Sequence, residues 1–275
     1  RFAKDMKFWD DQLDALGEPL YSDIQGPSVL EEARKRHGNP ELRSSDIEMK
    51  DLFVAVKDYY LEPEPTKNLI DFCMNHQLSM TNLLLLGIRT YLSKVNNGQE
   101  DITIQNFISR RSTHDEWTSG GSRTIMFPCR TVIAPETDFL SAAYEIQNMQ
   151  NRIYMHSNYD PALIMDEMRK RYNTPEHTGY ESCYLTYQPM PVKVENEMLG
   201  TIRQHAKWFA NGAATKKMYL TVSHTEDGGM NFSYHYQTAH LEEHDMELLY
   251  YYMMRILFKG IAEPDMSIGE IMELV

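Results

Sequence analysis

Two histidines with metal-ligand spacing, His240 and His244, stand near the expected start of a long helix. Residues four apart share one helical face, so both imidazoles could bind the same metal ion. However, Leu-Glu-Glu separates them, whereas a zincin carries Glu directly after its first His, and the sequence offers no evident third ligand. The sequence therefore predicts no metal site, and we expect His240 to lie at the N-cap of that helix.

A further histidine, His156, precedes Asp160 and Pro161 at an expected junction between two helices. A histidine and a carboxylate in one turn could work as a general acid–base pair. Polar side chains at such junctions more often bond to backbone groups of the turn. We favour this structural role, and the acid–base pair stays open as the alternative.

Three arginines, Arg110, Arg111 and Arg130, follow or end apolar segments that have the pattern of strands. A guanidinium in such a place usually clamps a carboxylate or the carbonyls of a loop. The sequence contains no GxSxG elbow, no GxxxxGK[ST] loop and no GxGxxG after a strand. These side chains therefore form no catalytic set, and we assign no catalytic residue within the chain.

Composition narrows the class of protein. The chain has 275 residues, of which 42% are hydrophobic and 24% charged, as expected for one large globular domain or two small ones. A formal net charge of −13 argues against a nucleic-acid partner and against docking on anionic lipid. No apolar run approaches the roughly 20 residues that span a bilayer, and no signal peptide is visible. Three separated cysteines without a CxxC pattern predict buried thiols in a reducing cytoplasm.

The segment 75–111 must form the centre of the fold. Ser79 or Thr81 can cap a helix, and leucines then recur at helical spacing up to Val95. After Asn97-Gly98 the period changes to two, which predicts a strand with Ile102, Ile104, Asn106 and Ile108 on one face and Thr103, Gln105 and Phe107 on the other. A helix this apolar needs cover on most of its surface, so this unit belongs in the core.

Other segments alternate between helix and strand patterns without repeats, which predicts an α/β fold with a mixed sheet covered by helices. The expected helices are 2–16, 28–36, one that opens at Thr66, 139–153, one that opens at Pro161, 242–260 and one capped by Ser267. The expected strands are 47–59, 123–133, 182–188, and a hairpin of 218–222 with 230–236. Residues 112–122 have the composition of a loop. Because Pro128 cannot donate to a ladder, its segment is expected to be an edge strand or a strand that turns into a loop.

Residues 79–111 resemble the condensation domain of nonribosomal peptide synthetases, a family of the chloramphenicol-acetyltransferase-like superfamily. The family run T-x-x-x-x-LLAA-ΦxxLLxxLxGQEDΦΦΦGxxxSGR, where Φ is apolar, appears here as SMTNLLLLGIRTYLSKVNNGQEDITIQNFISRR. Further family motifs follow in order and cover nearly the whole chain. They are FWxxxL at Phe8-Trp9…Leu13, LPLR at 127–130, HQDxPFE at 156–161, FNYQ at 185–188, and the terminal segment at 264–268.

The resemblance marks seven residues as candidates for the substrate tunnel or its structural motifs: Arg111, Pro128, Arg130, His156, Asp160, Thr186 and Gln188. The chain also departs from the family. Ile125 stands where FVNT has Asn, Thr186 where FNYQ has Asn, and the HQDxPFE segment has one extra residue and lacks its Phe and Glu. Tunnel contacts at these places are therefore in doubt, and we expect a divergent member.

The family's activity is attributed to HHxxxDG, and this sequence contains no adjacent His pair. The chain also starts without Met, so we expect residues 1–275 to be the C-terminal lobe of a longer protein, with the catalytic histidine in an N-terminal lobe. The resemblance implies amide formation between acyl or peptidyl and aminoacyl thioesters on carrier proteins, with no cofactor bound directly and the phosphopantetheine arm as substrate carrier. This lobe would supply a tunnel wall, a floor loop near 123–130, a crossing segment near 190–235 and a carrier-docking surface.

Isolated from the other lobe, the chain is expected to be inactive. We also expect apolar surface along the first helix and the crossing segment, and self-association through it. Two other functions stay open. The parent could be an ester-forming or epimerising relative, or the chain could be a non-catalytic docking module for carrier proteins.

Overall fold

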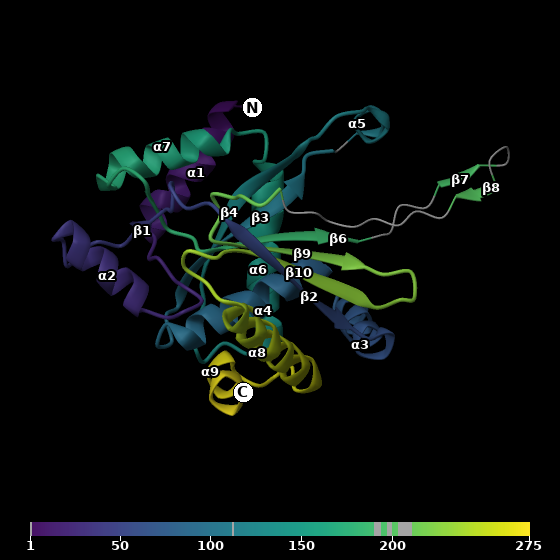
Figure 1. The fold of residues 1–275 in the computed structure, drawn as a ribbon. Coiled ribbons are helices and arrows are strands. Elements are labelled where there is room, and N and C mark those ends of the chain that lie inside the picture. Colours follow the sequence, from purple (N-terminus) through teal and green to yellow (C-terminus); the bar gives the residue numbers. More distant parts are fainter. Residues whose placement is uncertain (1, 112, 190–193, 197–199, 203–210) are drawn as a thin grey trace.

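The computed structural model describes residues 2–111, 113–189, 194–196, 200–202 and 211–275. Its centre is a six-stranded mixed sheet with the strand order β2-β10-β9-β6-β3-β4 (Figure 1). β6 is parallel to β3 and β9, and the other neighbours are antiparallel. The strands are β2 (Val54–Leu61), β3 (Asp101–Ser109), β4 (Thr124–Val132), β6 (Cys183–Gln188), β9 (Met218–His224) and β10 (Met230–Gln237).

Two small antiparallel pairs stand beside this sheet. β1 (Ser45–Asp46) pairs with β5 (Thr178–Gly179), and β7 (Val194–Asn196) pairs with β8 (Gly200–Ile202). Figure 1 places the β7–β8 pair away from the main sheet, on the side where the β9–β10 hairpin turns.

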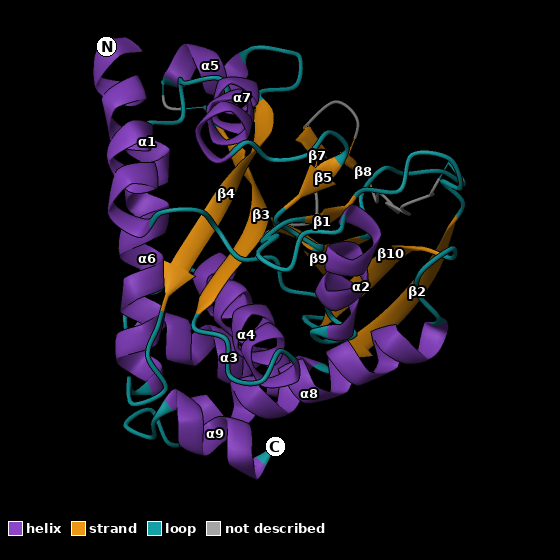
Figure 2. Ribbon diagram, turned by 90° about the vertical axis from the view of Figure 1, so that its left-hand side faces the viewer, coloured by secondary structure: helices purple, strands orange, loops and turns teal. Residues whose placement is uncertain are grey.

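One face of the main sheet carries the core. The strand residues that face it are fully buried, as in Leu185 of β6, Leu220 of β9 and Phe232 of β10. Helices α3 (Pro63–Asn75), α4 (Met80–Val95), α6 (Phe139–Met155) and α8 (Glu243–Ala262) pack against this face and one another, and Figure 2 shows them on one side of the strands. The remaining helices are α1 (Phe2–Leu16), α2 (Ser28–His37), α5 (His114–Thr118), α7 (Pro161–Tyr172) and α9 (Ile268–Leu274).

The predicted mixed sheet with helical cover is confirmed, as is its central unit. The Ser79 hydroxyl caps α4 by accepting from the Asn82 N–H, and α4 is buried along almost its whole length. The sequence did not predict that Arg89 of α4 lies inside the core, where its guanidinium donates to Thr131 Oγ1 at 3.2 Å and to the Ile133 carbonyl at 3.2 Å. Burial lowers the pKa of Arg89 to about 10.

Four predicted boundaries were wrong. α3 begins at Pro63 rather than Thr66, because proline is tolerated in a first helical turn, where its missing N–H would have no partner. The strand expected at 47–59 begins only at Val54. The loop expected at 112–122 contains α5, which a Thr113–Glu116 capping box stabilises. Glu242, not His240, is the N-cap of α8.

Two further expectations, for Pro128 and for the three cysteines, hold among the residues that the structure describes. β4 with Pro128 is an edge strand, and Cys73, Cys129 and Cys183 are buried and unpaired. No metal-binding cluster occurs among the described residues. None of the helices in the described ranges is long and apolar enough to cross a membrane.

Candidate functional site

The face of the sheet opposite the core carries a row of polar and aromatic side chains. The strand register places Gln105, Tyr184, Tyr219 and His235 directly opposite one another on β3, β6, β9 and β10. Residues that pair in register point to the same side of a sheet, so these four share the face that the core helices do not cover. We call this surface the open face.

A cluster at its middle has the composition of a ligand-contact surface. We define the open-face cluster as Phe107, Tyr184, Thr186, Lys216, Tyr219 and His235, all of them partly exposed. Aromatic rings beside a few polar groups are typical of substrate clefts.

Lys216 is the cation of this cluster. Its ammonium lies over the rings of Phe107, Tyr184 and Tyr219, at 5.5, 5.8 and 5.7 Å from the ring centroids. Burial lowers the pKa of Lys216, and no carboxylate of the described residues pairs with it. The rings therefore hold the amine by cation–π attraction and leave its N–H donors available to a ligand.

Of two polar rings in the cluster, Tyr219 has a hydrogen-bond partner and the Nε2 atom of His235 has none among the described residues. Thr186 Oγ1 and the Tyr219 hydroxyl lie 2.7 Å apart, which locks the tyrosine on the face. His235 Nε2 is buried and has no hydrogen-bond partner in the described part of the chain. An unpaired buried polar atom is costly, and the described residues supply no partner that would offset this cost for His235.

His235 makes a testable contribution to pH dependence. Burial lowers its pKa in the folded chain, against a smaller opposing effect of Asp58. A lowered pKa means that the neutral ring stabilises the fold above its ordinary pKa near 6.5 and that this stability is lost as the pH falls below it. We expect His235→Gln to reduce the loss of unfolding free energy between pH 7.5 and pH 5, measured by urea titration.

The exposed His244 provides the control for this experiment. His244→Gln should keep the pH dependence of the unchanged chain. A pH dependence that is identical in His235→Gln and in the unchanged chain would contradict the assignment.

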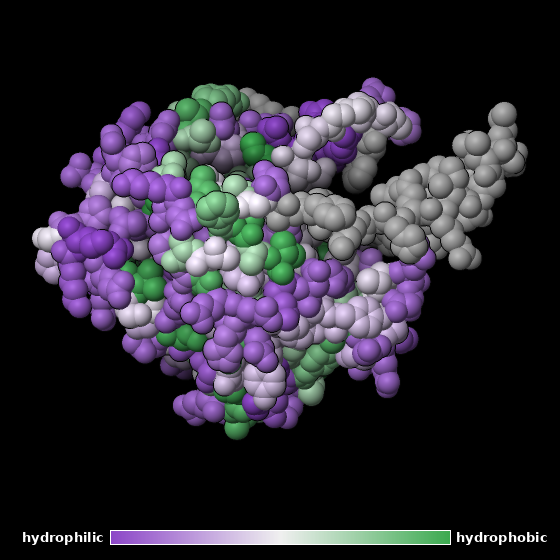
Figure 3. All heavy atoms as spheres, in the orientation of Figure 1, coloured by the Kyte–Doolittle hydropathy of each residue, from purple (hydrophilic) through white to green (hydrophobic). Residues whose placement is uncertain are grey.

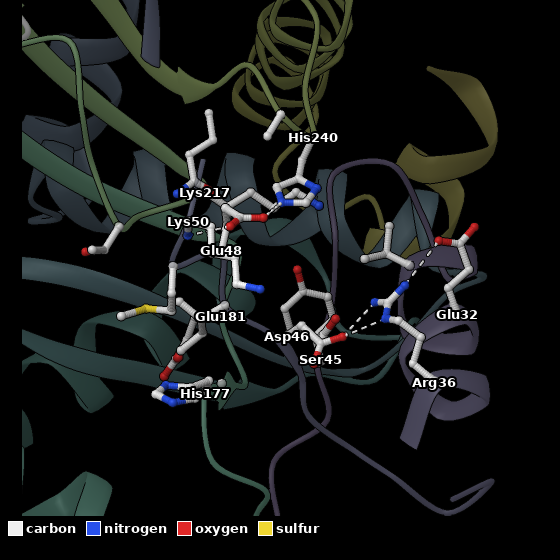
Figure 4. Close-up of a pocket in the computed structure, with 18 of the residues that line it drawn as sticks. Glu32, Arg36, Ser45, Asp46, Glu48, Lys50, His177, Glu181, Lys217 and His240 are labelled. Atoms are coloured by element: carbon white, nitrogen blue, oxygen red, sulfur yellow. Dashed lines mark hydrogen bonds and ion pairs between the residues drawn. The ribbon is translucent and has the colours of Figure 1, made fainter. Parts of the chain in front are cut away.

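A cleft of about 730 Å³ adjoins the open face at the start of β6 and β9. α2, the segment 45–50 and the loop before α8 form its other walls (Figure 4). Tyr184 belongs both to the cleft lining and to the open-face cluster, so the two surfaces are continuous.

Most charges in the cleft are already paired. Figure 4 shows Arg36 reaching Asp46 and Glu48 reaching His240, at 2.7 and 3.1 Å between nitrogen and oxygen. Lys217 reaches out of the cleft to the fully buried Asp23, 2.6 Å away.

A family model for the condensation domain matches residues 1–274. The chain belongs to the condensation-domain family. It is 20% identical over 272 residues to a plipastatin synthase polypeptide of Bacillus subtilis (strain 168), covering 98% of this chain and 10% of that protein.

Solved condensation domains share the fold. The first condensation domain of the calcium-dependent antibiotic synthetase, in complex with a substrate analogue, superposes with a TM-score of 0.72 at 15% identity, over 98% of this chain and 55% of that one. The condensation domain of the Monacolin K polyketide synthase superposes with a TM-score of 0.72 at 13% identity, over 97% of this chain and 59% of that one. This chain therefore spans little more than half the length of these condensation domains.

Two family-motif candidates, Thr186 and Gln188 of β6, lie on the open face of this condensation-family chain. Pro128 and Arg130 of β4 stand opposite Gln105 and Thr103, at the edge of the same face. Four of the motif positions thus lie on one side of the sheet.

Arg130 and Arg111 have structural roles, as the sequence indicated. Arg130 forms a two-point ion pair with Asp101, at 2.8 and 2.7 Å, and donates to the carbonyl of Leu16, the last residue of α1, and to that of the next residue, Gly17, at 2.6 Å. Arg111 donates to loop carbonyls around α5, among them Ser119 O at 2.8 Å.

His156 and Asp160 are not an acid–base pair. Asp160 caps α7 by accepting from the Ala162 N–H at 2.9 Å, which is the backbone role we favoured. His156 instead lies 2.9 Å from the nearly buried carboxylate of Asp5 and stacks on Phe8. Its role is to join α6 to α1. The two residues are 151 positions apart in the sequence, so no local pattern could reveal their contact.

Sequence reasoning missed Lys216, Tyr219 and His235. The available signal was the alternation in the hairpin. Tyr219 lies between the buried Met218 and Leu220, and His235 lies between the buried Tyr234 and Tyr236. Only the pairing of β9 with β6 and β10 brings these residues together.

Proposed function

We propose that residues 1–275 form the C-terminal lobe of a condensation domain of a nonribosomal peptide synthetase. The parent domain would join an acyl or peptidyl thioester to an aminoacyl thioester through an amide bond. The observation that carries the proposal is the family match over residues 1–274, in a chain that spans 55% of a solved condensation domain.

In this proposal the open face is one wall of the substrate tunnel. Its partly exposed aromatic and hydroxyl groups suit an extended, largely uncharged acyl chain, and the N–H donors of Lys216 suit its carbonyls. The amine attacks the thioester carbonyl, and the barrier falls mainly because both reactants are held at the required distance. A histidine of an HHxxxDG motif, absent from these 275 residues, would orient the amine or accept its proton.

The substrates would arrive on phosphopantetheine arms of carrier proteins in the cytoplasm, and no other cofactor is needed. The floor loop would be 123–130, and the expected crossing segment at 190–235 lies partly outside the described residues. Phe2, Met6 and Leu16 of α1 are 59%, 41% and 38% exposed, and hydrophobic spheres gather in Figure 3 where Figure 1 places the start of α1. This apolar surface supports contact with the other lobe, or self-association without it.

Gene context tests the proposal. We expect an in-frame HHxxxDG segment upstream of the codon for Arg1, with carrier and adenylation domains encoded in the same protein. Neighbouring epimerising or ester-forming modules would point to those relatives instead. A gene without the HHxxxDG half would overturn the proposal in favour of a non-catalytic docking module.

A further inference from the structure

Among the described residues that line the cleft beside the open face, one carboxylate has no ion-pair partner. Four acidic side chains line it: Glu32, Asp46, Glu48 and Glu181. Arg36 lies near both Glu32 and Asp46, and His240 pairs with Glu48. Glu181 has no ion-pair partner among the described residues.

The contacts of Glu181 stabilise only part of its carboxylate. One oxygen accepts from Gln105 Nε2 at 2.8 Å, which is a neutral donor from the open face. Burial raises the pKa of Glu181, against the smaller opposing effect of that hydrogen bond and of backbone N–H groups. An ionised carboxylate in such a place gains strongly from a cationic partner.

The cations around the cleft do not supply that partner. Arg36 is held by Asp46, and Lys217 by Asp23 at 2.6 Å. Lys50 also lines the cleft and is exposed to water, and no carboxylate of the described residues lies within ion-pair distance of its ammonium. Water screens the charge of an exposed lysine, so Lys50 opposes a second cation near Glu181 only weakly.

The walls of the cleft suit an organic cation better than a bare ion. Tyr21 and Tyr184 line it together with the apolar Val29 and Ile47, and its volume of about 730 Å³ exceeds what a metal ion needs. Aromatic faces attract ammonium groups, and apolar walls accept an alkyl stem. Figure 4 shows Glu181 on the opposite side of the cleft from Arg36 and Glu32 of α2, with Asp46 between them.

We propose that this cleft binds a ligand with an alkylammonium group, and that Glu181 is the counter-ion of that group. The stem lies against Tyr21, Tyr184 and Ile47. The inference does not depend on the proposed acyl transfer, because binding requires neither a carrier protein nor an HHxxxDG histidine.

Calorimetric titration of the whole chain at pH 7.5 tests the proposal with three probes. Nα-acetyl-lysine amide carries only a side-chain ammonium, norleucine amide only an α-ammonium, and Nα-acetyl-norleucine amide no charge. We expect at least one cationic probe to bind about tenfold or more tightly than the neutral probe, as for a charge-assisted hydrogen bond. The probe that binds identifies whether the site takes a side-chain amine or an α-amine.

Two variants locate the site. Glu181→Gln should weaken binding of the cationic probe about tenfold or more and leave binding of the neutral probe unchanged. Glu48→Gln, at a carboxylate of the same cleft that already has a partner, should change binding less than about twofold. Circular dichroism and thermal melting show whether each variant is folded.

Three results would overturn the proposal. They are equal binding of the cationic and neutral probes, no binding of either cationic probe to the unchanged chain, or undiminished binding by folded Glu181→Gln. None of these results affects the proposed amide-forming role of the parent domain, which the gene context tests separately.

Discussion

Replacing Arg130 with alanine is expected to lower the free energy of unfolding by about 3 kcal/mol, because the mostly buried carboxylate of Asp101 loses its nearest cation and keeps only Arg43, 3.9 Å away. The Arg130 and Asp101 side chains are only 11% and 17% exposed, and two hydrogen bonds of 2.8 and 2.7 Å join them. The same guanidinium donates to the carbonyls of Leu16 and Gly17, where α1 ends. The variant therefore loses an ion pair and the anchor of α1 together.

Arg36 provides a matched control, since it also contacts a single aspartate, Asp46, through two nitrogens. Its side chain is 54% exposed, so Arg36→Ala should cost less than about 1 kcal/mol. Urea denaturation followed by circular dichroism measures both variants. Equal costs for the two variants would contradict the role assigned to Arg130.

Replacing Asp23 with alanine is expected to cost about 3 to 5 kcal/mol of unfolding free energy, because a buried lysine loses its counter-ion. Asp23 is fully buried and pairs with Lys217, which is 14% exposed. It also accepts from the Tyr21 hydroxyl and from the Gln25 N–H at 3.0 Å. Asp23 thus keeps one wall of the cleft ordered and its lysine neutralised.

The double variant Asp23→Ala, Lys217→Met separates charge from the other contacts of Asp23. If the unpaired ammonium causes most of the loss, removing it should recover about half of the cost or more, as coupled neighbours do in a double-mutant cycle. Thermal and urea unfolding of the single and double variants gives the coupling energy. A double variant no more stable than Asp23→Ala would contradict this explanation.

Local pattern was enough for the elements of this fold but not for all their ends. The helix of α4 and the strand β3 were predictable because capping by Ser79 and the change of period after Asn97 act within a few residues. The start of α3 was missed because prolines 63 and 65 end the preceding strand pattern, although a first helical turn accepts them. α5 was missed because its five residues are too short for an apolar period, and only the cap at Thr113 indicates it.

The candidate site was only half predictable, for a different reason. Family motifs led to Thr186, Gln188, Pro128 and Arg130, which lie on one face of the sheet or at its edge. Lys216, Tyr219 and His235 have no motif, and their proximity arises from strand pairing between distant segments. His156 shows the same limit, since its partner Asp5 lies 151 residues away.

Amide formation from carrier-loaded substrates is the decisive measurement for the proposed two-lobed enzyme. The 275-residue chain is assayed with an acyl-loaded and an aminoacyl-loaded carrier protein, and product on the downstream carrier is read by mass spectrometry. The same assay is run with the chain extended upstream in its own gene through the expected HHxxxDG segment, and with that segment's second His changed to Ala. We expect product above the uncatalysed background only from the extended chain with both histidines, and turnover by the 275 residues alone would contradict the need for a second lobe.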